Sequence, residues 1–130
     1  MYNHLKQTVD AFEITLGINK GYGHNNECVT DFEADYQAIA TAIYKQTGVY
    51  VSSVIIPAKV VYNVDWGCPT DGEDVYVIKG VNNTQFVKPA DYKKAVTKLI
   101  EKLATTFEQS TVTTTWSTVK MVYTTKKGEL

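Results

Sequence analysis

The chain contains no arginine: all 13 of its basic residues are lysine. The planar guanidinium of arginine is the usual group for gripping a phosphate or carboxylate with two hydrogen bonds. An anion site in this protein must therefore use lysine, hydroxyl groups and backbone N–H groups. The net charge is −1 and no basic block is present, which argues against binding nucleic acid through a cationic face.

Cysteine, histidine and long apolar runs are also scarce. The two histidines and two cysteines, at positions 4, 24, 28 and 68, match no zinc pattern, so neither a metal site nor a cofactor is expected. No apolar run approaches the roughly 20 residues of a membrane span, and the opening MYNHLKQTVD does not resemble a signal peptide. We therefore expect a cytoplasmic protein with reduced cysteines and no membrane association.

Apolar residues are abundant, although they form no long runs. Hydrophobic residues make up 44% of the chain and charged residues 21%, a balance typical of globular rather than disordered proteins. The length suits a single domain that spans residues 1–130. The order of structural elements within this domain then follows from the spacing of the apolar residues.

Four segments have the pattern of β-strands. In AFEITLGI (11–18) apolar residues occupy every second position, which predicts a half-buried strand. Segments 49–64, 73–81 and 110–125 are rich in β-branched residues and predict three more strands. Pro57 lacks the N–H that a central strand must donate, so the second strand is expected at a sheet edge.

Two further segments, near 31–47 and 90–108, have helical periodicity. In each, apolar residues recur every three or four positions and form one face. Thr30 and Glu33 have the spacing of a capping box at the start of the first helix. Gly48 is placed to end that helix in a left-handed conformation.

The resulting order, β-α-β-β-α-β, predicts an α+β ferredoxin-like fold with two helices on one face of a four-stranded antiparallel sheet. The first and third strands are then central. The second and fourth strand segments are longer than the helices require, so either they bend sharply or the hairpin between the second and third strands projects from the body. Long, weakly charged edge strands favour a homo-oligomer.

This topology brings three connections to one end of the sheet: the first strand–helix loop, the hairpin tip and the turn after the second helix. The polar and aromatic residues expected there are Lys20, Tyr22, His24, Cys28, Asp65, Trp66, Cys68, Asp71 and Gln109.

The first strand–helix loop, within LGINKGYGHNNECVTDFE, raises the question of phosphate binding. Helix N-termini attract anions, but this loop matches neither the Walker pattern nor the dinucleotide fingerprint. Asp31 and Glu33 also place negative charge in the first helical turn. The loop is either an ordinary turn or a segment that contacts a ligand through Lys20, Tyr22 or His24.

A cysteine nucleophile is a further candidate. His24 and Cys28 are four residues apart in the loop, and Asp65 could orient the histidine. Glu27 and Asp31 oppose formation of the thiolate, however, because both place negative charge beside the sulfur. We therefore predict no catalytic residue.

Aromatic side chains are the stronger candidates for ligand contact. Trp66 lies in the hairpin loop without an evident core role, and Trp116 lies on the last strand. Exposed aromatic rings stack on nucleobases or anchor interfaces. The neighbouring carboxylates Asp71, Glu73 and Asp74 are interpreted as the solvated flank of the hairpin.

Three stretches carry a resemblance to a known family: FEITLGINK, TGVYVSSVIIPAKVVY and KLIEKLATTFEQSTVTTTW, within residues 11–123. In their element order they resemble the small phage proteins that antagonise the Thoeris defence. Those proteins are oligomeric sponges that bind a cyclic ADP-ribose-type signal without degrading it, commonly through arginine, which this chain lacks. A looser likeness is to PII-type signalling trimers, which share the element order and a long hairpin.

The resemblance implies a non-enzymatic, oligomeric protein that sequesters a nucleotide-like ligand, with Lys20, Tyr22, His24, Trp66 and Trp116 as ligand-binding residues. The alternative is a structural or protein-interaction module that assembles through its long edge strands. A third hypothesis is an enzyme that acts through the cysteine, histidine and aspartate candidates.

Overall fold

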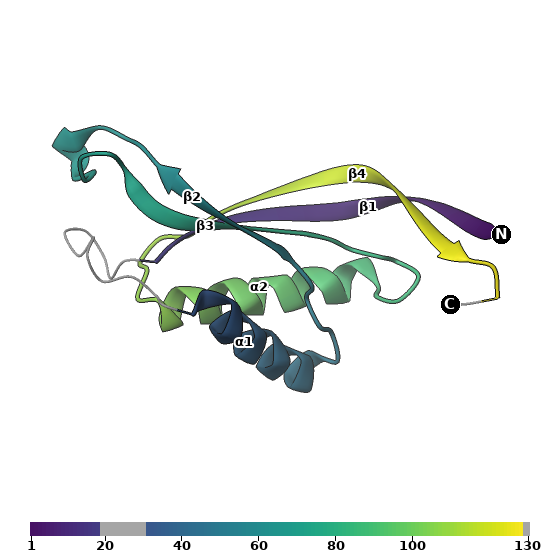
Figure 1. Ribbon diagram of the computed structural model, residues 1–130. Coiled ribbons are helices and arrows are strands. Elements are labelled where there is room, and N and C mark those ends of the chain that lie inside the picture. Colours follow the sequence, from purple (N-terminus) through teal and green to yellow (C-terminus); the bar gives the residue numbers. More distant parts are fainter. Residues whose placement is uncertain (19–30, 129–130) are drawn as a thin grey trace.

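The computed structural model describes residues 1–18 and 31–128. The elements are β1 (Tyr2–Gly17), α1 (Phe32–Thr47), β2 (Val54–Val60), the short 3₁₀ helix η1 (Val64–Trp66), β3 (Glu73–Val81), α2 (Pro89–Thr106) and β4 (Thr113–Lys126). Both α-helices cover the same face of the sheet (Figure 1). The predicted α+β fold with βαββαβ order is confirmed.

The four strands are antiparallel and follow the order β2-β3-β1-β4. β1 and β3 are therefore the central strands, as predicted. Pro57 lies on the edge strand β2, opposite Tyr76 of β3, so its missing N–H removes no hydrogen bond from the middle of the sheet.

The hydrophobic core lies between the sheet and the two helices. Phe12, Ile14 and Leu16 of β1 are buried, and the residues between them are more exposed, which is the alternation expected of a strand with one covered face. Phe32 of α1 stacks on Tyr76, with ring centroids 4.2 Å apart. Neither of the described α-helices is long and apolar enough to cross a membrane.

The N-terminal cap of α1 differs from the prediction, and its C-terminal end agrees with it. The helix is capped by Asp31, whose carboxylate accepts a hydrogen bond from the backbone N–H of Ala34 at 3.4 Å. Thr30, the predicted cap, lies outside the described residues. Gly48 follows the helix with a φ of 78°, the left-handed conformation that glycine adopts without steric cost.

Two strands differ in length from the prediction. β2 is confined to Val54–Val60, whereas β1 begins at Tyr2. Residues 2–10 of β1 pair only with residues 118–126 of β4, and this two-stranded arm extends beyond the helices (Figure 1). Most of its N-terminal residues are exposed, so no apolar alternation marks this part of the strand in the sequence.

Candidate functional site

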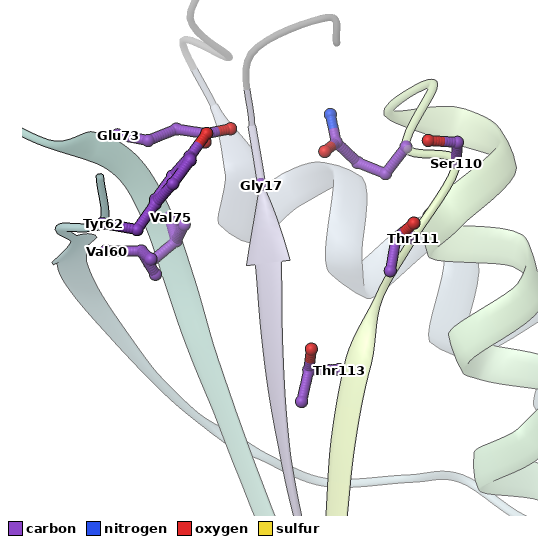
Figure 2. Close-up of a pocket in the computed structure, with 9 residues that line it drawn as sticks. Gly17, Val60, Tyr62, Glu73, Val75, Ser110, Thr111 and Thr113 are labelled. Atoms are coloured by element: carbon purple, nitrogen blue, oxygen red, sulfur yellow. The ribbon is translucent and has the colours of Figure 1, made fainter. Parts of the chain in front are cut away.

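A cavity of about 200 Å³ lies at the loop end of the sheet (Figure 2). It opens on the face that the helices leave uncovered, because Gly17 and Val75, which pair across β1 and β3, alternate with the residues that face the core. The described residues that line it are Gly17, Val60, Tyr62, Glu73, Val75, Gln109, Ser110, Thr111 and Thr113.

Tyr62 and Glu73 form one wall of the cavity. Glu73 is the first residue of β3 and pairs with Val60, the last residue of β2, while Tyr62 lies two residues further on. The hydroxyl of Tyr62 donates a hydrogen bond to Oε2 of Glu73 at 3.1 Å. Because the acceptor is a carboxylate, this bond is stronger than one between neutral groups, and it orients the carboxylate in the cavity.

Gln109 approaches from the opposite side, on the turn that ends α2. The N–H of Glu108 bonds to the carbonyl of Thr105 at 3.3 Å, and that of Gln109 to Ala104 at 2.9 Å. This pair of bonds defines a Schellman motif. Its left-handed position, usually glycine, is occupied by Glu108 with a φ of 53°.

The Gln109 amide is oriented by the same turn. Its Nε2 donates to the carbonyl oxygen of Phe107 at 3.0 Å. A β-carbon added at Gly17 would lie 2.5 Å from Oε1 of Gln109 and 3.4 Å from Oε1 of Glu73. The two oxygens therefore approach the same point above β1 from opposite sides.

This arrangement suits a cation better than an anion. Glu73 supplies a carboxylate and Gln109 a carbonyl oxygen, and both accept hydrogen bonds. None of the described lining residues is lysine, and Lys59, on the adjacent strand, is paired with Asp74 at 2.8 Å. Within residues 1–18 and 31–128, no three His, Cys, Asp or Glu side chains gather closely enough to hold a metal ion.

The predicted ligand-binding residues have different positions. Lys20, Tyr22 and His24 lie outside the described residues. Trp66 is in η1 at the hairpin tip, 76% exposed, and does not line the cavity. Trp116 packs beside α2, with its ring centroid 6.4 Å from that of Tyr92, at a distance from the cavity along β4.

The structure also corrects one interpretation and adds one residue. Glu73 was interpreted as part of a solvated flank, but it lines the cavity and bonds to Tyr62, which the sequence did not single out. Gln109 was among the residues expected at this end of the sheet, and it does line the cavity. A tyrosine and a glutamate on either side of a hairpin connection form no motif, so only their pairing in space reveals them.

The fold is ferredoxin-like, and the cavity on its uncovered sheet face is the candidate site. The SAM lyase family model matches residues 7–125, so the chain belongs to the SAM lyase family. A search of curated proteins gives no match.

Two solved structures share the fold. One is a phage SAM lyase in complex with S-methyl-5′-thioadenosine, with a TM-score of 0.62 and 19% identity over 90% of this chain and 88% of that one. The other is a phage SAM lyase in the apo state, with a TM-score of 0.62 and 18% identity over 95% and 93% of the two chains.

The family assignment overturns three predictions. The resemblance to Thoeris sponges is wrong, and so are the prediction of a non-enzymatic sequestering protein and the prediction that the chain is not an enzyme, because the family is one of lyases. The resemblance rested on element order, which unrelated ferredoxin-like domains share. Glu73, whose side chain lines the cavity, lay outside the three stretches that carried the resemblance.

Proposed function

We propose that this protein cleaves S-adenosylmethionine and releases S-methyl-5′-thioadenosine. The observation that carries the proposal is the carboxylate of Glu73, held in the cavity by Tyr62 and facing the carbonyl oxygen of Gln109. S-adenosylmethionine carries a sulfonium and an ammonium group and no phosphate. An acceptor-rich, negatively charged wall complements such a ligand, and the family assignment supports the same substrate.

The reaction breaks the bond between sulfur and Cγ of the amino-acid chain, and the electron pair of that bond goes to sulfur. The thioether that leaves is neutral. In a lyase no water is added, so the substrate's own carboxylate oxygen can attack Cγ and close a lactone, which balances atoms and charge. Removal of a proton from Cβ would need a base far stronger than a carboxylate, because no neighbouring group makes that proton acidic.

The residues on the cavity wall then have distinct roles. Glu73 and Gln109 bind the cationic amino-acid end of the substrate, and Tyr62 fixes the carboxylate. Holding the chain in a bent conformation, with the attacking oxygen near Cγ, supplies the main rate enhancement, because sulfonium is already a good leaving group.

The cavity is smaller than a typical ligand pocket of about 300–1,000 Å³. It therefore matches the amino-acid end, and the nucleoside extends beyond it. The hairpin that β2 and β3 form projects from the body of the domain (Figure 1). Trp66 belongs to the connection between these two strands, whose ends supply Val60 and Glu73 to the cavity, so its predicted role in stacking on the base remains a proposal. The same holds for Lys20, Tyr22, His24 and Trp116.

Assembly and location also remain predictions. β2 and β4 are the two edges of the sheet, and their free edges support the predicted homo-oligomer. Light scattering at micromolar concentration tests it, and a monomer would contradict it. A cytoplasmic location fits a substrate that occurs inside cells.

The direct test is to incubate the purified protein with S-adenosylmethionine and to analyse the products by mass spectrometry. We expect S-methyl-5′-thioadenosine together with homoserine lactone. Homoserine formed from the start, in place of the lactone, would contradict the intramolecular route. Binding without turnover would contradict the proposed function.

A further inference from the structure

Gly17 is the last residue of β1 and lines the cavity (Figure 2). Oxygen atoms of both Gln109 and Glu73 lie near the position that a β-carbon of Gly17 would occupy. The backbone at this position does not need glycine, because Gly17 is not one of the glycines with positive φ, which among the described residues are Gly48, Gly67, Gly72 and Gly128. Alanine would therefore be conformationally acceptable at this position. The requirement that the structure imposes on Gly17 is steric.

The space above Gly17 is occupied by the side chain of Gln109. A β-carbon at Gly17 would lie 2.5 Å from Oε1 of Gln109, closer than nonbonded carbon and oxygen atoms tolerate, and a tight 3.0 Å from Cδ of the same residue. The amide lies at the end of a flexible side chain, so it could move, but a shift would disturb the hydrogen bond of 3.0 Å from its Nε2 to the carbonyl of Phe107.

We propose that Gly17 is a positioning residue of the lyase site: it lacks a side chain so that Gln109 can present its carbonyl oxygen beside the carboxylate of Glu73. The inference rests on the proposed function, because the shared target of the two oxygens is the ammonium group of the substrate. Gly17 itself contacts no reacting atom in this account. It acts by keeping open the space that Gln109 occupies.

The test is a double-mutant cycle with Gly17→Ala, Gln109→Ala and the combined variant. Steady-state kinetics of S-methyl-5′-thioadenosine formation would give kcat and KM for each. A displacement of about 1 Å in a positioning group can cost up to about 100-fold in rate. We expect Gly17→Ala to lower kcat/KM by about tenfold or more in the wild-type background, mainly through KM.

In the Gln109→Ala background the same glycine substitution should change kcat/KM by less than about twofold, because the two changes act through one contact and are therefore not additive. A purely structural role for Gly17 would instead lower the activity equally in both backgrounds and would lower the melting temperature in both. Equal effects in the two backgrounds, or no effect of Gly17→Ala at all, would overturn the inference.

Ala11→Ser is the matched control. It adds one heavy atom on the same strand and the same face as Gly17, six positions along the strand and outside the cavity lining, and should leave kcat/KM unchanged. An inactive wild-type protein would refute the proposed function and the inference with it. If the wild type is active but the effects of Gly17→Ala and Gln109→Ala on kcat/KM are additive, only the role of Gly17 is refuted.

Discussion

The two ends of the long strand β1 have different surroundings. Residues 11–15 pair with both β3 and β4, residues 16 and 17 pair with β3, and Phe12, Ile14 and Leu16 face the core, whereas residues 2–10 pair with β4 alone in the arm. The helix-backed end has the cavity, and its floor is a residue of β1 itself. A site needs side chains held in place by several packed elements, and only one end of this strand provides them.

The two ends also differ in charge. Glu73 is the acidic residue among the described residues that line the cavity. The connections and helix ends at the same end of the sheet add the described acids Asp31, Glu33, Asp65, Asp71, Asp74 and Glu108, and Lys59 is paired to Asp74. The arm instead has Lys6, Lys120 and Lys126 against the single carboxylate of Asp10. A cationic substrate is thus attracted to the end of the molecule where the cavity lies, and a neutral thioether product is not.

The largest effect is expected for Glu73→Gln at the cavity end. The substitution keeps the shape of the side chain but removes the charge that faces the substrate cation. Loss of one such electrostatic contact typically lowers kcat/KM by about 100-fold or more. The assay is formation of S-methyl-5′-thioadenosine. Asp74→Asn, one residue along the same strand but paired with Lys59 at the surface, is the control. Similar losses in both variants would mean that Glu73 has no special role.

Tyr62→Phe should have the next largest effect. It deletes the hydrogen bond of 3.1 Å to Glu73, and a bond to a charged group is worth about 1.5–3 kcal/mol. We expect kcat/KM to fall by about tenfold or more. Tyr44→Phe, at an exposed position on α1, is the control and should leave kcat/KM unchanged. Wild-type kinetics for Tyr62→Phe would show that the carboxylate does not depend on this bond for its position.

Ionic strength provides a milder test of the charge difference. Raising the salt concentration shortens the Debye length to about 3 Å at 1 M, so attraction of the cationic substrate to the acidic end weakens. KM for S-adenosylmethionine should rise a few-fold with salt. Inhibition by the neutral S-methyl-5′-thioadenosine should hardly change. A KM that is independent of salt would contradict the steering role of these acids.

In the arm, Tyr123→Ala should affect stability and leave catalysis unchanged. The Tyr123 ring meets Phe86 edge-on, with centroids 6.0 Å apart, and such a pair contributes about 0.5–1.5 kcal/mol beyond the area it buries. We expect a lower melting temperature in calorimetry and an unchanged kcat/KM at 25 °C. A catalytic defect in a folded variant would show that the arm contributes to the site.

The smallest expected effect is a gain in stability. Glu108 has a left-handed backbone with a φ of 53° at the end of α2, a conformation that costs a residue with a side chain roughly 1 kcal/mol. Glu108→Gly should therefore raise the free energy of unfolding by up to about 1 kcal/mol, as measured by denaturant titration. A loss of stability would indicate that interactions of the Glu108 side chain outweigh the backbone strain.

Much of the fold could be predicted because it depends on local patterns. The alternation of Phe12, Ile14 and Leu16 and the two helical periodicities indicated the elements and their order. Pro57 identified an edge strand. Residues 2–10 were not predicted to form a strand. They are held in place by pairing with β4 and not by burial of one face, so they have no apolar alternation.

The candidate site was predictable only in part. The topology predicted three connections at one end of the sheet, of which the first lies outside the described residues, and Gln109, one of the residues expected there, lines the cavity. Glu73 was misinterpreted because an acidic residue near a turn is usually solvated. The enzymatic nature of the family was missed as well, since element order is shared by proteins with unrelated functions.

The sequence by itself determined the class of fold, the central strands and the absence of arginine from any site. Only the tertiary structure decided that Gly17, Glu73 and Gln109 meet in one cavity. These residues are far apart in the chain, and their meeting depends on strand register and on the turn after α2. Apolar periodicity specifies which face of an element is buried, whereas the distance between two side chains is set by how the elements pack together.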